Sequence, residues 1–333
     1  MSPRRIPLNI FGMGFGLSGL ATSWRIAADL NVASHWFSDA MTAAAAMVWA
    51  GSCVAYLRYA AATPDAWSRD LSDMTAGPFA SLAVITPILL AANGIAPYSP
   101  AAAAVVVDVF AVLVLLLGGW FTGFWMRGGT DFDRLHPGYF LPTVAGGLVA
   151  AAGLAEVGQQ RFAQMMLGLG LVCWAILGSM ILGRLIFRPP LPDALTPTMA
   201  IEVAPAAVAS LTHFFANGGR VDFFAAVLAG YGLLMVTAQL PLLPRYLRLS
   251  FSLGTWAFTF SWTAVAGAAL FWIASTRFVG DRASSYLVLA IITGLVSGIA
   301  ARTLAAAMRG QLLPAPVAET KIGSRPQSAS SAS

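Results

Sequence analysis

Residues 101–126 read AAAAVVVDVFAVLVLLLGGWFTGFWM and hold a single charged residue, Asp108, in 26 positions. A helix that crosses the hydrocarbon core of a bilayer needs about 20 mostly apolar residues, at about 1.5 Å of rise each. This stretch is long enough, and its apolar run is continuous instead of alternating in steps of two. It therefore predicts a transmembrane helix and not a strand of a membrane barrel.

Nine further stretches of this kind lie on both sides of it, separated by short polar joints. They are residues 6–27, 40–62, 79–95, 139–157, 162–187, 196–215, 223–243, 250–275 and 284–308. Apolar residues make up 58% of the chain and charged residues only 10%, with a mean hydropathy of +0.75. A soluble domain of this composition could not cover its surface with polar groups. The sequence thus predicts an all-α, polytopic membrane protein with ten transmembrane helices.

The chain divides into a transmembrane domain, residues 1–312, and a tail, residues 313–333. The tail is rich in Ser, Ala and Pro and has no apolar face, so we expect it to be disordered and cytoplasmic. Residues 1–20 lack a small-x-small cleavage motif, so we expect the first span to be retained.

The basic residues are divided unequally between the two sides that ten spans define. Loops facing the cytoplasm collect Lys and Arg. Fourteen of the nineteen basic residues lie on the side of both termini, and the other five are Arg25, Arg161, Arg220, Arg277 and Arg282. This predicts a multi-pass protein of the inner (plasma) membrane with cytoplasmic termini and lipids as partners. No basic stretch is interleaved with stacking aromatic residues, so the sequence gives no sign of nucleic-acid binding.

Motifs for cofactors, metals and catalysis fail on their context. Residues 14–19, GFGLSG, match a dinucleotide-binding fingerprint, but a strand must precede that motif and here the glycines continue an apolar helix. The only lysine is Lys321, so no phosphate-binding loop exists. The two cysteines and three histidines share no metal-ligand spacing. We expect no cofactor, no metal and no enzyme. A membrane-embedded enzyme using Asp108, Glu202 and His213 remains a distant alternative.

Prolines recur inside alternate spans. Pro87, Pro142 and Pro205 lie in the third, fifth and seventh spans, whereas the even spans lack interior prolines. A proline inside a helix leaves a backbone carbonyl unpaired, which a wet cavity tolerates better than lipid does. The odd spans are therefore predicted to surround a lumen, with the even spans forming an outer layer. Hydroxyls, exposed carbonyls at the kinks and positively charged mouths would then favour anions.

Two acidic residues fall inside spans. Glu202 would repel anions as a bare carboxylate, so either Arg184, Arg245 or Arg302 neutralises it or burial keeps it neutral and able to carry a proton. We expect Asp108, in the outer layer, to bond a neighbouring helix.

Three motifs, HPGYFLPT at 136–143, TPTMAIEVAPAAVAS at 196–210 and FSLGTWAFTFSW at 251–262, resemble the tellurite-resistance/dicarboxylate transporter family, which includes the plant slow-type anion channels. Residues 11–17 of the first span also fit. The resemblance implies five helical hairpins around a central pore, inner helices from the odd spans, and a homotrimer with one pore in each protomer. It also implies a pore gate at Phe260, although Ser261 stands where the plant channels often have proline.

The sequence therefore predicts an anion channel or facilitator for small anions such as chloride or nitrate. Its site residues are the gate Phe260, the pore-lining candidates and the acid Glu202, a possible proton or ion-pair site. The pore-lining candidates are Gly16, Pro87, Pro142, Thr143, Pro205 and Thr259. The alternative is a proton-coupled exporter or uptake carrier for C4-dicarboxylate, sulfite or tellurite, with Glu202 as its proton site.

Overall fold

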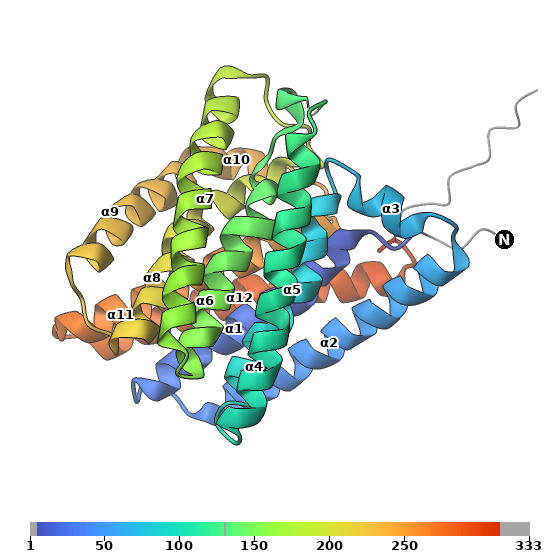
Figure 1. Cartoon of the computed structure of the whole chain (residues 1–333). Coiled ribbons are helices and arrows are strands. Elements are labelled where there is room, and N and C mark those ends of the chain that lie inside the picture. The colour runs from blue at the N-terminus through green and yellow to red at the C-terminus, as the bar shows by residue number, and fades with distance from the viewer. Residues whose placement is uncertain (1–4, 130, 314–333) are drawn as a thin grey trace, which may run out of the picture.

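The computed structural model describes residues 5–129 and 131–313, and in these residues it contains helices and no strand (Figure 1). The predicted tail lies, apart from Leu313, outside the described residues. The long helices are α1 (Gly12–Asp29), α2 (His35–Ala62), α4 (Ser81–Gly94), α5 (Pro100–Met126), α6 (Gly146–Glu156), α7 (Gln160–Phe187), α8 (Ala204–Asn217), α9 (Phe223–Ala238), α11 (Ala257–Thr276) and α12 (Asp281–Met308). They occupy the ten predicted spans in order.

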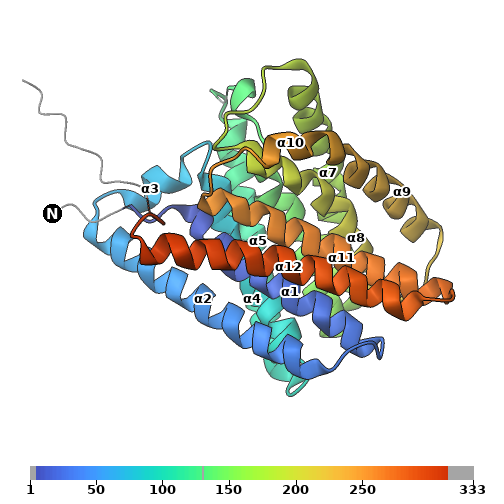
Figure 2. The same cartoon turned by 180° about the vertical axis from the view of Figure 1, so that it is seen from behind.

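The ten helices form five hairpins around a closed ring. Within each hairpin the two consecutive helices pack together: α1 with α2, α4 with α5, α6 with α7, α8 with α9, and α11 with α12. The first helices of the hairpins also pack on one another in the order α1, α4, α6, α8, α11 and back to α1. In Figures 1 and 2 the other five helices lie outside this ring. This arrangement confirms the predicted hairpins and the division into inner and outer helices.

Burial separates the two sets clearly. In the most apolar part of the third, fifth, seventh and ninth spans, 72, 94, 72 and 44% of residues are buried, against 22–28% in the even spans. The outer helices therefore present most of their apolar side chains outward, as a bilayer requires. Nine helices of the described chain are long and apolar enough to cross a membrane, and α1 is not among them. Because α1 is rich in Gly, Ser and Thr and is held inside the bundle, it can be less apolar than a helix that faces lipid.

Each inner span begins with a tight helical segment instead of a regular α-helix. These segments are η1 (Leu8–Phe11), η2 (Gly77–Ala80), η4 (Pro137–Tyr139) with the π-helical η5 (Leu141–Ala145), η6 (Thr196–Val203) and η8 (Leu253–Trp256). Neighbouring segments pack on one another, from η1 to η2, η4, η6, η8 and back to η1. Proline occupies the first turn of η2, η4, η5 and η6, where a missing N–H has no helical partner to lose. The inner helices therefore all start at one end of the molecule, on a common ring.

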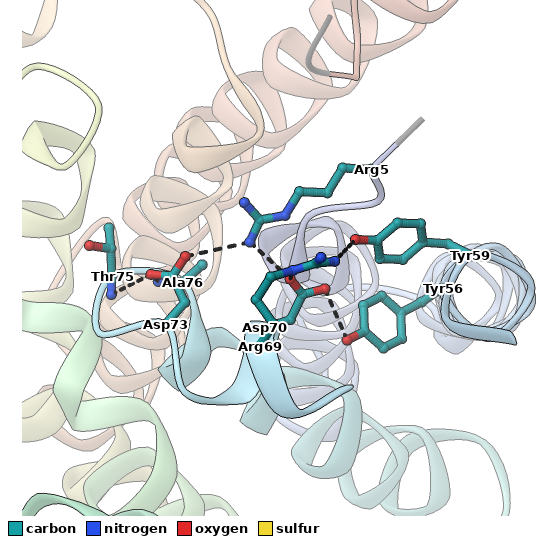
Figure 3. A network of polar contacts seen from close by, with 8 residues as sticks. All are labelled: Arg5, Tyr56, Tyr59, Arg69, Asp70, Asp73, Thr75 and Ala76. Carbon is teal, nitrogen blue, oxygen red and sulfur yellow. Dashed lines mark hydrogen bonds and ion pairs between the residues drawn. The ribbon is translucent and has the colours of Figure 1, made fainter. Parts of the chain in front are cut away.

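A short helix that the sequence analysis missed, α3 (Ala66–Leu71), closes the first joint at that end. Its buried Asp70 accepts from Arg5 at 2.9 Å and from the Tyr56 hydroxyl at 3.3 Å (Figure 3). Arg69 donates to the Tyr59 hydroxyl at 2.7 Å. The network ties the N-terminal segment, α2 and α3 together beside the ring of tight segments.

Candidate functional site

Three small cavities follow one another along the inside of the ring of inner helices. The first, here called the inner cavity, lies against the tight segments and is lined by residues of α1, η5, α6, η6, α8 and α11, with a volume of about 30 Å³. The middle cavity, of about 50 Å³, is lined by residues of all five inner helices. The outer cavity, of about 20 Å³, lies at the far ends of these helices. A site needs about 10–15 Å³ for each water, so each cavity has room for only a few.

Phe260 of α11 lies between the inner and middle cavities. It lines both, and so do Phe15 of α1, Val149 of α6 and Val208 of α8. The Phe260 and Phe15 ring centroids are 5.2 Å apart at an interplanar angle of 47°. Only 6% of each residue is exposed. Two tilted rings and two valines thus form the partition between these cavities.

A second partition separates the middle and outer cavities. Phe215 of α8, Leu89 of α4, Thr22 of α1 and Ala152 of α6 line both. The polar side chains along this part of the axis are few, and Thr22 accepts a hydrogen bond from the Asn93 amide at 2.8 Å. The lumen is therefore narrow and mostly apolar between the two partitions.

Of the other predicted pore-lining residues, Pro205 lines the inner cavity, but Gly16 and Thr259 face each other at the contact of α1 with α11. A Cβ atom at Gly16 would lie 2.9 Å from the Cβ of Thr259, so the glycine permits close packing of these helices. The Thr259 hydroxyl donates to the Trp256 carbonyl at 2.7 Å. Neither residue is among those that line the three cavities.

Pro142 and Thr143 lie against α5 of the outer layer and line none of the three cavities. A Cβ at Gly118 of α5 would lie 3.0 Å from the Pro142 carbonyl oxygen and 3.4 Å from the Thr143 methyl group. Pro87 is buried within α4 and is also absent from the cavity walls. The sequence pattern thus identified the inner spans through their prolines but did not show which faces of these spans turn inward.

The residues that sequence reasoning missed are mainly apolar. Phe15 lies within residues 11–17, the segment of the first span that fits the family, and this fit was the one sign in the sequence that it could line the lumen. Val149, Val208 and Phe215 belong to spans so apolar that nothing in the sequence distinguishes them from other core residues.

The outer cavity carries one cationic and two acidic side chains. Arg25 donates through Nη1 to the carbonyl oxygens of Ala92 and Asn93, at 2.8 and 2.9 Å, and its Nε lies 3.7 Å from Asp29. Asp29 and Glu156 are both exposed and line the same cavity. With these groups ionised, the three side chains sum to one negative charge, which differs from the positively charged mouth expected from the sequence.

Glu202 lies on η6, 4% exposed, and its Oε1 has no hydrogen-bond partner. The three arginines proposed to neutralise it are engaged elsewhere. Arg184 donates to the Asp133 and Pro189 carbonyls, Arg245 donates to the Leu191 carbonyl, and Arg302 lies over the Phe251 ring. The expected ion pair is therefore not found among the described residues. Glu202 also lines none of the three cavities.

The remaining chemistry-bearing residues are dispersed. Asp108 accepts from the Gln159 amide at 2.8 Å, at the start of the neighbouring α7, which confirms the predicted bond between helices. His213 pairs with Asp222 at 2.8 Å. No contact in the described chain joins Asp108 or His213 to Glu202. The described residues contain no group of three or more His, Cys, Asp or Glu placed to hold a metal.

An all-helical membrane bundle with a ring of inner helices around a constricted apolar axis defines a channel or a transporter. The model of the SLAC1 family, voltage-dependent anion channel, matches residues 5–311, and the chain belongs to this family. The tellurite resistance protein TehA homolog of Haemophilus influenzae is 28% identical over 275 residues, which cover 80% of this chain and 81% of that protein. The family confirms the predicted resemblance and makes the chain an anion channel or transporter.

Proposed function

We propose that the protein is an anion channel whose lumen runs through the inner, middle and outer cavities and is closed by Phe260. The observation that carries this proposal is the position of the Phe260 ring between the inner and middle cavities, which are adjacent along the axis. An aromatic ring in a narrow apolar lumen blocks a hydrated ion sterically and disfavours continuous water. Phe15 completes the barrier from the neighbouring inner helix, α1.

The walls of the inner and middle cavities carry no charged residue. A permeating anion would thus meet dipoles and apolar groups. The two hydroxyls of the middle cavity, Thr22 and Thr263, already donate to the Ser18 and Phe260 carbonyls. Weak binding of this kind suits rapid passage and modest discrimination among small anions such as chloride and nitrate.

The experiment is anion-substitution recording with purified protein in planar bilayers. A channel follows the anion gradient alone, so its reversal potential should shift when chloride is replaced by a larger anion and stay constant when pH is changed at fixed chloride. A reversal potential that moves with the proton gradient would instead indicate a proton-coupled carrier.

The carrier for dicarboxylate, sulfite or tellurite is kept as the second candidate because Glu202 is buried without an ion-pair partner. Such a carboxyl could bind a proton. Glu202 lines none of the three cavities, which argues against a direct role in coupling, since a coupling proton and the substrate normally meet at a shared site.

The assembly and orientation belong to the same proposal. We infer a homotrimer in the inner membrane, with one lumen in each protomer, both termini in the cytoplasm and residues 313–333 as a separate cytoplasmic tail. Cross-linking of purified protein in lipid nanodiscs tests the trimer. Labelling of single cysteines placed at the two ends of the molecule tests the orientation.

A further inference from the structure

A pocket with two arginines lies at the end of the molecule where the inner helices begin. Its volume is about 220 Å³, and it is bounded by the segment before α11 and by the last turns of α12. It is separate from the three cavities and shares no lining residue with them. Its lining residues are Phe251, Ser252, Leu253, Arg302, Ala305, Ala306, Arg309, Gln311 and Leu312. It is several times larger than any of the three cavities.

The charges of this pocket are of one sign. Arg302 lies on α12 and Arg309, the C-cap of that helix, follows seven residues later, which places the two about two turns apart on the same side. Neither guanidinium has an ion pair or a hydrogen bond within the described residues, and no acidic residue lines the pocket. Two unpaired guanidinium groups, with the neutral side chains of Ser252 and Gln311 nearby, form a set of donors without an anionic partner.

Arg302 is also held in place. Its guanidinium carbon lies 5.2 Å from the centroid of the Phe251 ring, in a cation–π contact. This contact restricts a long side chain while leaving its N–H groups free, so less conformational freedom is lost when it binds a ligand.

We propose that the Arg302–Arg309 pocket binds a phosphate group, carried either by an anionic lipid headgroup or by free phosphate. Arginine matches phosphate oxygens with paired N–H donors, and two arginines can share one group. A lipid can reach the pocket because α12 is an outer helix that exposes most of its apolar side chains, and basic residues at the end of a transmembrane helix attract anionic headgroups.

The pocket is linked to the helix that carries Phe260. Leu253 belongs to η8, which continues directly into α11, and Trp256 Nε1 donates to the Thr303 hydroxyl of α12 at 3.0 Å. A phosphate bound between Ser252 and the two arginines would clamp η8 against α12 and so hold the start of α11. This regulatory step rests on the proposed function, whereas phosphate binding itself does not.

Binding is tested by thermal unfolding of the purified full-length protein in a nonionic detergent. One arm compares inorganic phosphate with sodium chloride at equal ionic strength, and another compares micelles containing phosphatidylglycerol with micelles containing phosphatidylcholine. A ligand at about 10 to 100 times its Kd should raise the Tm of wild type by about 2–5 °C. The rise should be lost in the double variant Arg302→Gln/Arg309→Gln. It should persist in Arg127→Gln, which removes an exposed, unpaired arginine at the end of α5.

A rise with inorganic phosphate alone would support the site with a soluble ligand, and a rise with phosphatidylglycerol alone would support it with a lipid. No rise in either arm for wild type, or an equal loss in Arg127→Gln, would overturn the proposal. In planar bilayers, exchange of phosphatidylglycerol for phosphatidylcholine should change the open fraction of wild type and leave the double variant unchanged. If the protein does not conduct anions while the thermal shift persists, the proposed function fails and the pocket assignment stands.

Discussion

The proposed gate predicts that Phe260→Ala opens the lumen. The ring now separates cavities of about 30 and 50 Å³, and deletion of a large buried side chain leaves a space on the order of 150 Å³ where the surroundings do not collapse. The joined space would be larger than the two cavities together, and the steric block between them would be gone. Lowering the barrier by about 1.4 kcal/mol gives a tenfold rise in rate, and we expect the loss of a steric block to exceed this.

Stability should fall in the same variant, because Phe→Ala in a core typically costs about 3–5 kcal/mol. Since cavities already lie on both sides of the ring, we expect the cost to be near the lower end of that range. The assay is chloride and nitrate conductance in planar bilayers at equal amounts of inserted protein. Equal conductance of wild type and Phe260→Ala, with both proteins folded and inserted, would refute the gate assignment.

Two companion variants separate gating from general loosening of the bundle. Phe258→Ala removes a ring that packs on Tyr246 at 4.8 Å between centroids and does not line the cavities, so its conductance should stay at the wild-type value. Phe15→Ala should raise conductance less than Phe260→Ala does, because the Phe260 ring still lies across the axis. Equal gains from Phe258→Ala and Phe260→Ala would indicate a nonspecific leak.

Three further predictions concern stability and pH. Glu202→Gln should leave the Tm within about 2 °C of wild type, because no arginine loses a partner, and the current should stay unchanged from pH 5 to 8. A large fall in Tm, or loss of a proton-dependent current, would contradict this. Asp70→Asn should lower the free energy of unfolding by about 2 kcal/mol because it weakens the bonds to Arg5 and Tyr56, whereas Asp193→Asn, at a 90% exposed side chain, should have little effect in the same denaturation assay. Burial lowers the pKa of His136 from 6.5 to about 4. Between these values the unfolded chain binds a proton at this side chain and the folded protein does not. The free energy of unfolding should therefore fall by about 3 kcal/mol as the pH drops from 6.5 to 4. Denaturation at several pH values should show this fall in wild type and a flatter profile in His136→Asn; identical profiles would contradict it.

The positions of the helices could be predicted from the sequence because lipid imposes a simple demand on them. A spanning segment must be long and apolar, so each of the ten stretches overlaps one of the observed helices. The inner helices α1, α6, α8 and α11 begin six to eight residues after the predicted starts, because a tight segment precedes each of them. The three interior prolines correctly marked inner spans, although only Pro142 lies in a tight segment; Pro87 is inside α4 and Pro205 is in the first turn of α8. α3 was missed because a six-residue helix in a polar joint has no apolar period to reveal it.

The faces of the helices could not be predicted in the same way. Apart from α1, the inner spans are apolar on nearly all sides, so no period distinguishes the side that packs on a neighbour from the side that borders a cavity. Gly16 was expected at the lumen and instead allows α1 to approach Thr259. The pairing of Glu202 with an arginine also failed as a prediction, because side-chain direction depends on packing: Arg184 reaches the Asp133 carbonyl in the next joint instead.

The common direction of the inner helices favours a channel over a carrier that exposes its site alternately to each side. Many such carriers are built from inverted repeats and bind substrate where broken helices meet near the middle of the membrane. Here every hairpin begins with an inner helix that starts on the same ring of tight segments, and α8 and α11 run without interruption past the cavities. If Phe260 is the proposed gate, opening of its partition needs no rocking of one half of the bundle against the other. Rotation of the ring into the space beside it would join the inner and middle cavities, and side-chain rotation is faster by orders of magnitude than motion of whole helical bundles. A conductance that is high in Phe260→Ala and insensitive to cross-links between neighbouring inner helices would fit this local gate, whereas conductance abolished by such cross-links would require movement of the helices themselves.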